Sequence, residues 1–194
     1  MKYLPLLFAL SIMTFHTSAQ DKPSLPYYEI PDYPESYTAE TVAARMIDGL
    51  GFRYYWATEG LRPEDLEYRP NDMARSTGET IDHILGLTNM VVKATTKQTN
   101  GGKVDKQELT FDEIRRRTLE NLKTASDILK SSTSEGLEDY KIRYDNGKEI
   151  PFWNMINGPI ADATWHVGQV VSFRRSSGNP FNSKASVFSG KVRE

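Results

Sequence analysis

The side chains best suited to chemistry in this sequence are two histidines and an aspartate: His83, Asp162 and His166. Asp162 and His166 are four residues apart in a segment with helical spacing, which places both on one helix face about one turn, or about 5.4 Å, apart. A metal ion held by one helix needs a further ligand from a neighbouring helix, and His83 is the only other imidazole after residue 16. Two imidazoles and one carboxylate with open positions suit zinc, iron(II), nickel or manganese. The alternative is that both histidines are hydrogen-bonded structural residues, since the D-x-x-x-H spacing alone is a weak signal.

The composition excludes several other kinds of site. The 194 residues include no cysteine, so the chain can form no disulfide, thiolate nucleophile or zinc finger, and any metal must be held by nitrogen and oxygen. The 24 basic and 26 acidic residues give a net charge of -2, which leaves no basic excess to neutralise phosphates. We therefore expect no nucleic-acid partner.

The first twenty residues, MKYLPLLFALSIMTFHTSAQ, have the pattern of a secretory signal peptide. Lys2 precedes an apolar run from Tyr3 to Phe15, and the small residues Thr17-Ser18-Ala19 follow it. The run is shorter than the roughly 20 residues that span a bilayer, so we expect cleavage after residue 19, export to the periplasm or beyond, and no stable membrane anchor in the mature protein. A retained membrane anchor is the alternative.

Four segments have the spacing of amphipathic helices: residues 38–60, 76–97, 110–130 and 152–177. Ser76 with Glu79, and Thr110 with Glu113, form the S/T-x-x-E pattern of a capping box, which predicts where the second and third helices begin. Pro159 lies inside the fourth segment, so we expect a kink near residue 157 or a helix that begins at the proline.

The remaining segments are shorter or polar. Asn146-Gly147 in the alternating stretch 140–150 predicts a two-stranded hairpin before the last helix, and the proline-bounded stretch 62–70 predicts a loop. Together these patterns predict an all-α protein, a four-helix bundle over residues 38–180, preceded by an extended arm at 20–37 and followed by a polar tail at 181–194.

Two segments resemble the DinB/YfiT-like superfamily. The stretch DATWHVGQVVSFRR is similar to the last helix of that family, with its H-x-x-x-H-x-G-Q pattern, and GETIDHILGL is similar to the family's histidine-bearing second helix. The resemblance implies a four-helix bundle in which many members bind a divalent metal through three histidines, often as dimers, so a homodimer is left open here. It places the ligands on His83, Asp162 and His166, with aspartate in place of the first histidine of the pair. This replacement can either keep the site with a harder ligand or mark a lineage that has lost the metal.

Residues near the candidate site have two interpretations each. Gln169 is expected to pack or to support a ligand rather than to react. Glu79 can act as a base, but its place in the capping box is the simpler interpretation. Arg174 and Arg175 complement the helix dipole in solvent, or they attract an anionic substrate. We expect the aromatic residues to fill the core and its grooves: Phe52, Tyr54, Tyr55, Trp56 and Trp165.

These observations lead to one main functional hypothesis. We expect an exported metal-dependent enzyme with hydrolase-like chemistry on a small-molecule substrate, using zinc, nickel, iron or manganese. The alternatives are a non-catalytic metal-binding or stress-associated bundle protein and a thiol-dependent transferase. An exported location disfavours a cytosolic thiol cosubstrate.

Overall fold

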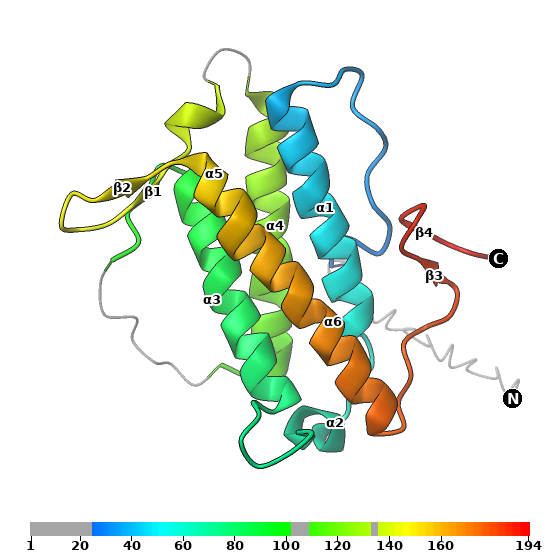
Figure 1. The fold of residues 1–194 in the computed structure, drawn as a ribbon. Helices are drawn as coiled ribbons and strands as arrows, with labels where there is room; N and C mark the ends of the chain where they lie inside the picture. The colour runs from blue at the N-terminus through cyan, green and yellow to red at the C-terminus, as the bar shows by residue number, and fades with distance from the viewer. Residues whose placement is uncertain (1–24, 102–108, 133–135) are drawn as a thin grey trace, which may run out of the picture.

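Four long helices build the protein, as the sequence predicts. The computed structural model describes residues 25–101, 109–132 and 136–194, and Figure 1 shows the helices as a bundle. The bundle helices are α1 (Ala39–Thr58), α3 (Thr77–Thr95), α4 (Phe111–Ser131) and α6 (Ala161–Ser176). Each packs on two neighbours, α1 on α4 and α6, and α3 on α4 and α6, which closes the bundle. The core is filled from all four by fully buried side chains such as Tyr54, Ile84, Leu122 and Val170.

Local hydrogen bonds explain where two of these helices begin. The Ser76 hydroxyl accepts a hydrogen bond from the Glu79 amide, and the Glu79 carboxylate accepts one from the Ser76 amide, at 3.1 and 2.6 Å. Thr110 and Glu113 make the same pair of bonds at the start of α4. Each box satisfies two amides that have no partner within the helix. Both predicted starts are confirmed.

The last helix contains a π-helical turn where the sequence predicts a kink or a late start. A short helix, α5 (Phe152–Met155), runs into the π-helical segment η2 (Ile156–Ile160), which runs into α6. Figure 1 shows the three as one continuous rod. Pro159 lies in η2, where the wider turn accommodates a residue that has no amide hydrogen and whose ring crowds the preceding turn. Asp162 follows in the first turn of α6, so this turn helps to set which way Asp162 faces.

The predicted hairpin before the last helix is present. Strands β1 (Ile142–Arg143) and β2 (Glu149–Ile150) pair antiparallel, with Ile142 opposite Ile150, and the one-turn helix η1 (Leu137–Asp139) precedes them. Gly147 has a φ of +79°, which a glycine adopts without strain. The prediction of a loop at 62–70 is wrong in part, because Pro63–Glu67 form the short helix α2, with proline at its first position.

The N-terminal arm lies on the bundle, and a buried aspartate holds it there. The side chain of Tyr27 is buried and its hydroxyl donates to the Asp48 carboxylate of α1 at 3.1 Å. Ser126 of α4 donates to the same carboxylate at 2.6 Å, and Lys130 forms an ion pair with it at 2.6 Å. Burial, followed by the charge of Asp48, raises the pKa of Tyr27 well above its usual range, so this phenol remains a hydrogen-bond donor.

The residues predicted as a polar tail form a second hairpin that packs on α1. Strands β3 (Ala185–Ser186) and β4 (Lys191–Val192) pair antiparallel. The amide of Ile30 in the arm donates to the Gly190 carbonyl at 2.8 Å, and a Cβ at Gly190 would overlap the Ile30 side chain. Ala185 and Ile30 are buried with Phe52 and Trp56 of α1 in a small second core. The short strands carry little sequence signal, which is why the hairpin was not predicted.

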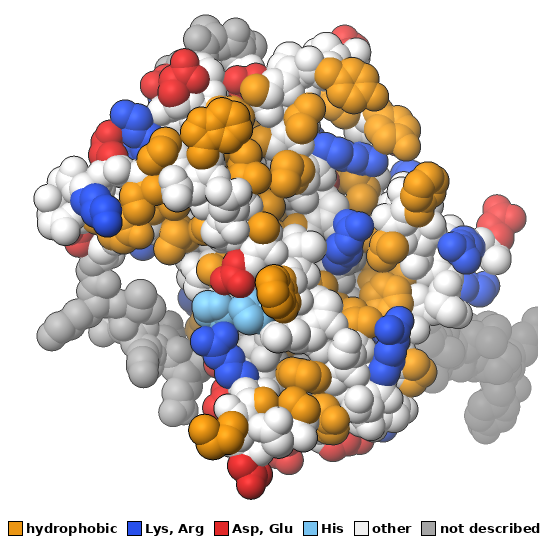
Figure 2. Space-filling view, in the orientation of Figure 1, with side chains coloured by type: hydrophobic (Ala, Val, Ile, Leu, Met, Phe, Trp, Pro, Cys, Tyr) orange, Lys and Arg blue, Asp and Glu red, His pale blue; other side chains and the backbone are white. Residues whose placement is uncertain are grey.

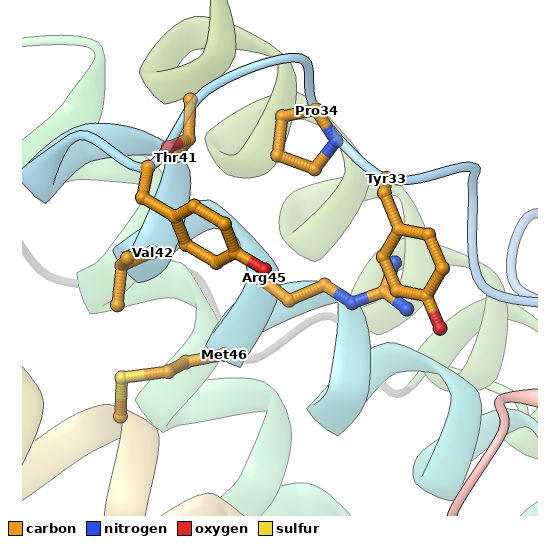
Figure 3. Close-up of a pocket in the computed structure, with 7 residues that line it drawn as sticks. Tyr33, Pro34, Thr41, Val42, Arg45 and Met46 are labelled. Atoms are coloured by element: carbon orange, nitrogen blue, oxygen red, sulfur yellow. The ribbon is translucent and has the colours of Figure 1, made fainter.

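On the face of the molecule that Figure 2 shows, hydrophobic side chains remain exposed at the upper end, over α5 and the start of α1. There the arm and α1 enclose a pocket of about 410 Å³. Figure 3 shows the Arg45 guanidinium beside the Tyr33 ring, and Arg45 Cζ is 4.8 Å from the centroid of that ring. Arg45 also donates to the Pro31 carbonyl at 2.7 Å, so the charged side chain of this pocket already serves to fix the arm on α1.

The predicted signal peptide at 1–19 lies outside the described residues. Within the described ranges, no helix combines the length and the apolar character needed to cross a bilayer.

Candidate metal centre

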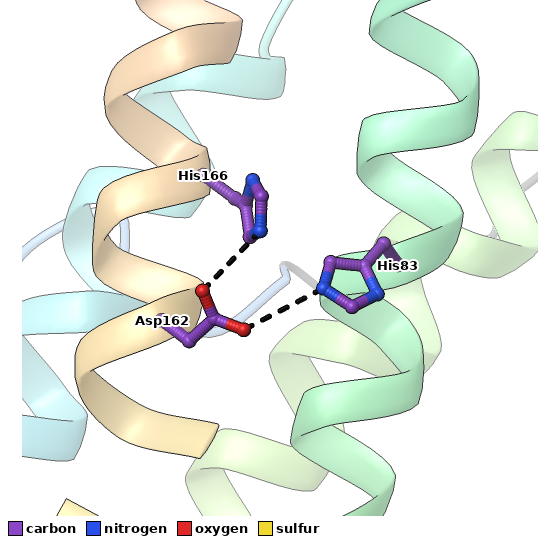
Figure 4. Close-up of side chains that lie close together, drawn as sticks. All are labelled: His83, Asp162 and His166. Atoms are coloured by element: carbon purple, nitrogen blue, oxygen red, sulfur yellow. Dashed lines mark ion pairs between the residues drawn. The ribbon is translucent and has the colours of Figure 1, made fainter. Parts of the chain in front are cut away.

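The structure brings together the three side chains that the sequence singles out. His83 extends from α3, and Asp162 and His166 extend from α6, toward one point between the two helices (Figure 4). One ligand atom from each lies within 4.8 Å of the others. In the space-filling view the histidines reach the surface, with an acidic side chain above them and basic side chains below them (Figure 2). Within the part of the chain that the structure describes, this is the only group of three or more such side chains placed to hold a metal ion.

The distances within the group fit a shared ion better than direct hydrogen bonds. His83 Nε2 is 3.5 Å from Asp162 Oδ2, and His166 Nε2 is 3.3 Å from Asp162 Oδ1. Good N–H···O hydrogen bonds are about 2.7–3.2 Å long. Two ligands that each lie about 2.1 Å from a tetrahedral ion are about 3.4 Å apart. The rings stand edge to face with centroids 4.7 Å apart, which keeps one nitrogen of each ring on the side of the carboxylate.

Gln169 orients one of the histidines. His166 Nδ1 is 2.7 Å from Gln169 Oε1, a hydrogen bond that Nδ1 donates in the tautomer that carries its proton there. This tautomer leaves a lone pair on Nε2, the nitrogen that faces Asp162. A metal-binding histidine commonly donates its other ring N–H to such an acceptor. Gln169 therefore contacts His166, as expected of a residue that packs or supports a ligand.

The site is half-open to solvent. The exposed fraction of the side chain is 15% for His166, 34% for His83 and 42% for Asp162. The pair of ligands on α6 therefore has a sheltered member and an open one, and a small molecule can approach from the side of Asp162. Trp165 is 73% exposed, so the prediction that it fills the core is wrong, whereas Phe52, Tyr54 and Trp56 are buried as expected.

Glu79 is occupied at the helix start rather than free to act as a base. Its carboxylate accepts the Ser76 amide and forms an ion pair with Arg69 at 3.4 Å. The Ser76 amide, followed by the charge of Arg69, holds the pKa of Glu79 below its usual range. The capping interpretation of Glu79 is confirmed.

Arg174 has a structural role that the sequence analysis missed. Its side chain is buried, and its guanidinium donates to the carbonyls of Trp56 and Ala57 at the end of α1, both at 3.0 Å. It also donates to the carbonyl and side chain of Asn179. The interpretation of Arg174 as a solvated residue is therefore wrong, although Arg175 beside it is exposed. Only the packing of α6 across the end of α1 reveals this role.

A buried carboxylate continues this network. Asp65 of α2 accepts two hydrogen bonds from the Arg62 guanidinium and one from the Arg62 amide, and it also accepts from Ser177 and Asn179 just after α6. These donors, Arg62 first, lower the pKa of Asp65 strongly. The network connects the end of α1, α2 and the end of α6, and it lies outside the metal-ligand group.

Neither a protein-family model nor a curated protein matches the sequence. Among solved structures, the chain is similar to a DinB-like protein, YjoA, from Bacillus subtilis. The two superpose with a TM-score of 0.51 over 69% of this chain and 92% of that one, at 16% sequence identity. The chain has the DinB-like fold. At this identity the likeness establishes the fold alone, so the function must be argued from the site.

Within this bundle, the three residues that the resemblance singles out lie together. The second and last bundle helices lie side by side, and the aspartate stands one turn before His166. The carboxylate brings a charge that an imidazole lacks, and it meets both histidines with separate oxygens. The departure at residue 162 therefore preserves a set of three converging ligand atoms.

Proposed function

We propose that this protein is an exported metal-dependent enzyme whose ion is held by His83, Asp162 and His166. The observation that carries the proposal is the convergence of two ring nitrogens and a carboxylate, with one ligand atom of each within 4.8 Å of the others and with His166 Nδ1 beside Gln169 Oε1. The donors are imidazole nitrogen and carboxylate oxygen, which suits zinc, nickel, iron(II) or manganese. Export is supported by the sequence pattern of residues 1–19.

Hydrolysis of a small-molecule substrate is the chemistry that this site favours. A divalent ion held by these three residues would act as a Lewis acid and would lower the pKa of water at the site. Three protein ligands leave further positions free, as catalytic sites require. The most exposed of the three, Asp162, lies on the open side of the site, from which a small molecule can approach. His166 and Gln169 hold the sheltered side in a fixed geometry.

Metal analysis of the purified full chain tests the proposal. We expect about one divalent ion per chain, and His83→Ala, Asp162→Ala and His166→Ala should each lower the metal content without loss of helical circular dichroism, because a bundle core does not depend on a metal. Asp145→Ala, a change at an exposed aspartate in the hairpin turn, is the matched control and should keep the ion. Full metal content in His83→Ala would overturn the ligand assignment.

Activity is tested separately on panels of ester, amide and phosphoester substrates, with and without chelator. We expect chelator-sensitive turnover that is restored by one divalent ion and lost in the ligand variants. A stoichiometric ion with no turnover on any panel would contradict hydrolysis and would favour a non-catalytic metal-binding protein.

A further inference from the structure

A second site lies on the opposite side of α6. A groove of about 410 Å³ runs between α1, α6 and the β3–β4 hairpin. On α6 the residues Gly168, Val171 and Arg175 face it, whereas His166 and Gln169 face α3, which matches opposite faces of one helix. The groove therefore shares no residue with the metal centre.

Apolar side chains form most of the groove. Its α6 wall contains Val167, which is buried, and Val171, and its outer wall is the hairpin with Phe181, Ala185 and Val187. Figure 2 shows basic side chains above and below the hydrophobic surface between α6 and the hairpin. A volume of this size is typical of sites for small molecules.

The charged residues of the groove are both arginines. Arg53 of α1 and Arg175 of α6 line it, and its lining includes no acidic residue, although the chain as a whole has a net charge of -2. Arg53 donates to the Gly49 carbonyl at 2.9 Å, which uses one of its five N–H donors. Within the described ranges, the Arg175 side chain makes no hydrogen bond or ion pair, and its backbone carbonyl is bonded to the Gly178 amide. Guanidinium groups beside an apolar wall are well suited to bind a carboxylate through charge-assisted hydrogen bonds.

The groove is open beside Gly168. It lies on the α6 wall, and a Cβ built there meets no atom within 4 Å. The pocket between the arm and α1 has only one arginine, Arg45, and that side chain already donates a hydrogen bond to the Pro31 carbonyl. The groove beside α6 thus combines apolar walls, free donors and open space.

We propose that this groove binds a small molecule that carries a carboxylate on a short apolar chain. The apolar part of the ligand lies against the hairpin and against the valines of α6, and the carboxylate of the ligand pairs with Arg53 and Arg175. The class of ligand follows from the charge and polarity of the lining and is independent of the metal-dependent function proposed above.

Calorimetric titration of the full chain with octanoate, below its micelle concentration, tests this proposal. We expect one octanoate per protein chain. Acetate lacks the apolar chain and octylammonium lacks the carboxylate, so each should bind at least about tenfold more weakly. Arg53→Gln and Arg175→Gln should each weaken octanoate binding about tenfold through the loss of a charge-assisted hydrogen bond. Gly168→Phe should abolish it by filling the groove.

Three controls keep the outcomes separate. Gly168→Ala adds a Cβ into open space and should still bind octanoate, and Arg116→Gln removes the same charge from an exposed site on α4 and should bind it normally. His83→Ala should also bind normally, since the groove does not use the metal centre. Octylammonium binding as tight as that of octanoate, or octanoate binding unchanged by Gly168→Phe, would overturn the proposal. A clear preference for anionic phospholipid vesicles over octanoate would overturn it as well.

Discussion

Gln169 provides a sharp test of the metal centre because it contacts no proposed ion itself. Gln169→Leu keeps the bulk of the side chain and removes the oxygen that accepts the His166 Nδ1–H bond at 2.7 Å. The lost hydrogen bond is worth about 1 kcal/mol. Without this hydrogen bond the His166 imidazole can adopt two ring orientations, each with two tautomers. Metal binding must then select one of these four states, which costs about 0.8 kcal/mol. Because this bond is already made before an ion binds, its own energy cancels between the free and the bound protein, and the selection term predicts metal binding about fourfold weaker than in the wild type.

Competition titration of metal-free protein against a chromophoric zinc chelator measures this change directly. Gln98→Leu, which alters an exposed glutamine after α3, is the matched control and should retain wild-type affinity. Gln169→Glu should bind at least as tightly as the wild type, because a carboxylate accepts the same hydrogen bond and makes the ring a better donor. Affinity within twofold of the wild type in Gln169→Leu would refute the view that this bond prepares His166 for a metal.

Three further predictions concern other parts of the chain. Asp65→Asn should lower the free energy of unfolding by about 2–3 kcal/mol at pH 7, since hydrogen bonds to a buried charge are lost. Folding lowers the pKa of Asp65, so its carboxylate contributes its full stabilisation above the unfolded pKa near 3.8, and this stabilisation falls as the pH drops through the folded pKa. Urea unfolding should therefore show the stabilities of the wild type and Asp65→Asn converging in acid. Asp162→His should raise the preference for zinc or nickel over manganese, because nitrogen replaces a hard oxygen ligand, and an unchanged preference in competition titrations would place residue 162 outside the site. Protein from the native host should begin at Gln20, and mass spectrometry that finds Met1 on cytoplasmic material would contradict export.

Local interactions explain which parts of the fold can be predicted from the sequence. The capping boxes at Ser76 and Thr110 depend on residues three apart, so the starts of α3 and α4 follow from short patterns. The i, i+4 spacing places Asp162 and His166 on one face for the same reason. The contribution of His83 also could be anticipated, because a bundle brings the second and last helices together.

Features that depend on distant packing could not be predicted. Arg174 is buried because α6 crosses the last carbonyls of α1, residues more than a hundred positions earlier. The hairpin after α6 is stable because Ile30 and Phe52 cover it, and two-residue strands have no periodicity of their own. Trp165 is exposed although it is large and apolar, since it lies on neither packed face of α6.

These distant interactions also control the geometry of the site. A metal ion accepts ligands only within about 0.2 Å of its preferred distances, so α6 must be fixed in both rotation and height against α3. At one end, the π-helical turn at Pro159 sets the rotation with which Asp162 enters α6. At the other end of α6, Arg174 donates to the last carbonyls of α1 and Asn179 donates to Asp65. These bonds fix the position of α6 along its own axis. The proposed ligand residues lie on α3 and α6, and interactions at the two ends of α6 determine whether their atoms meet.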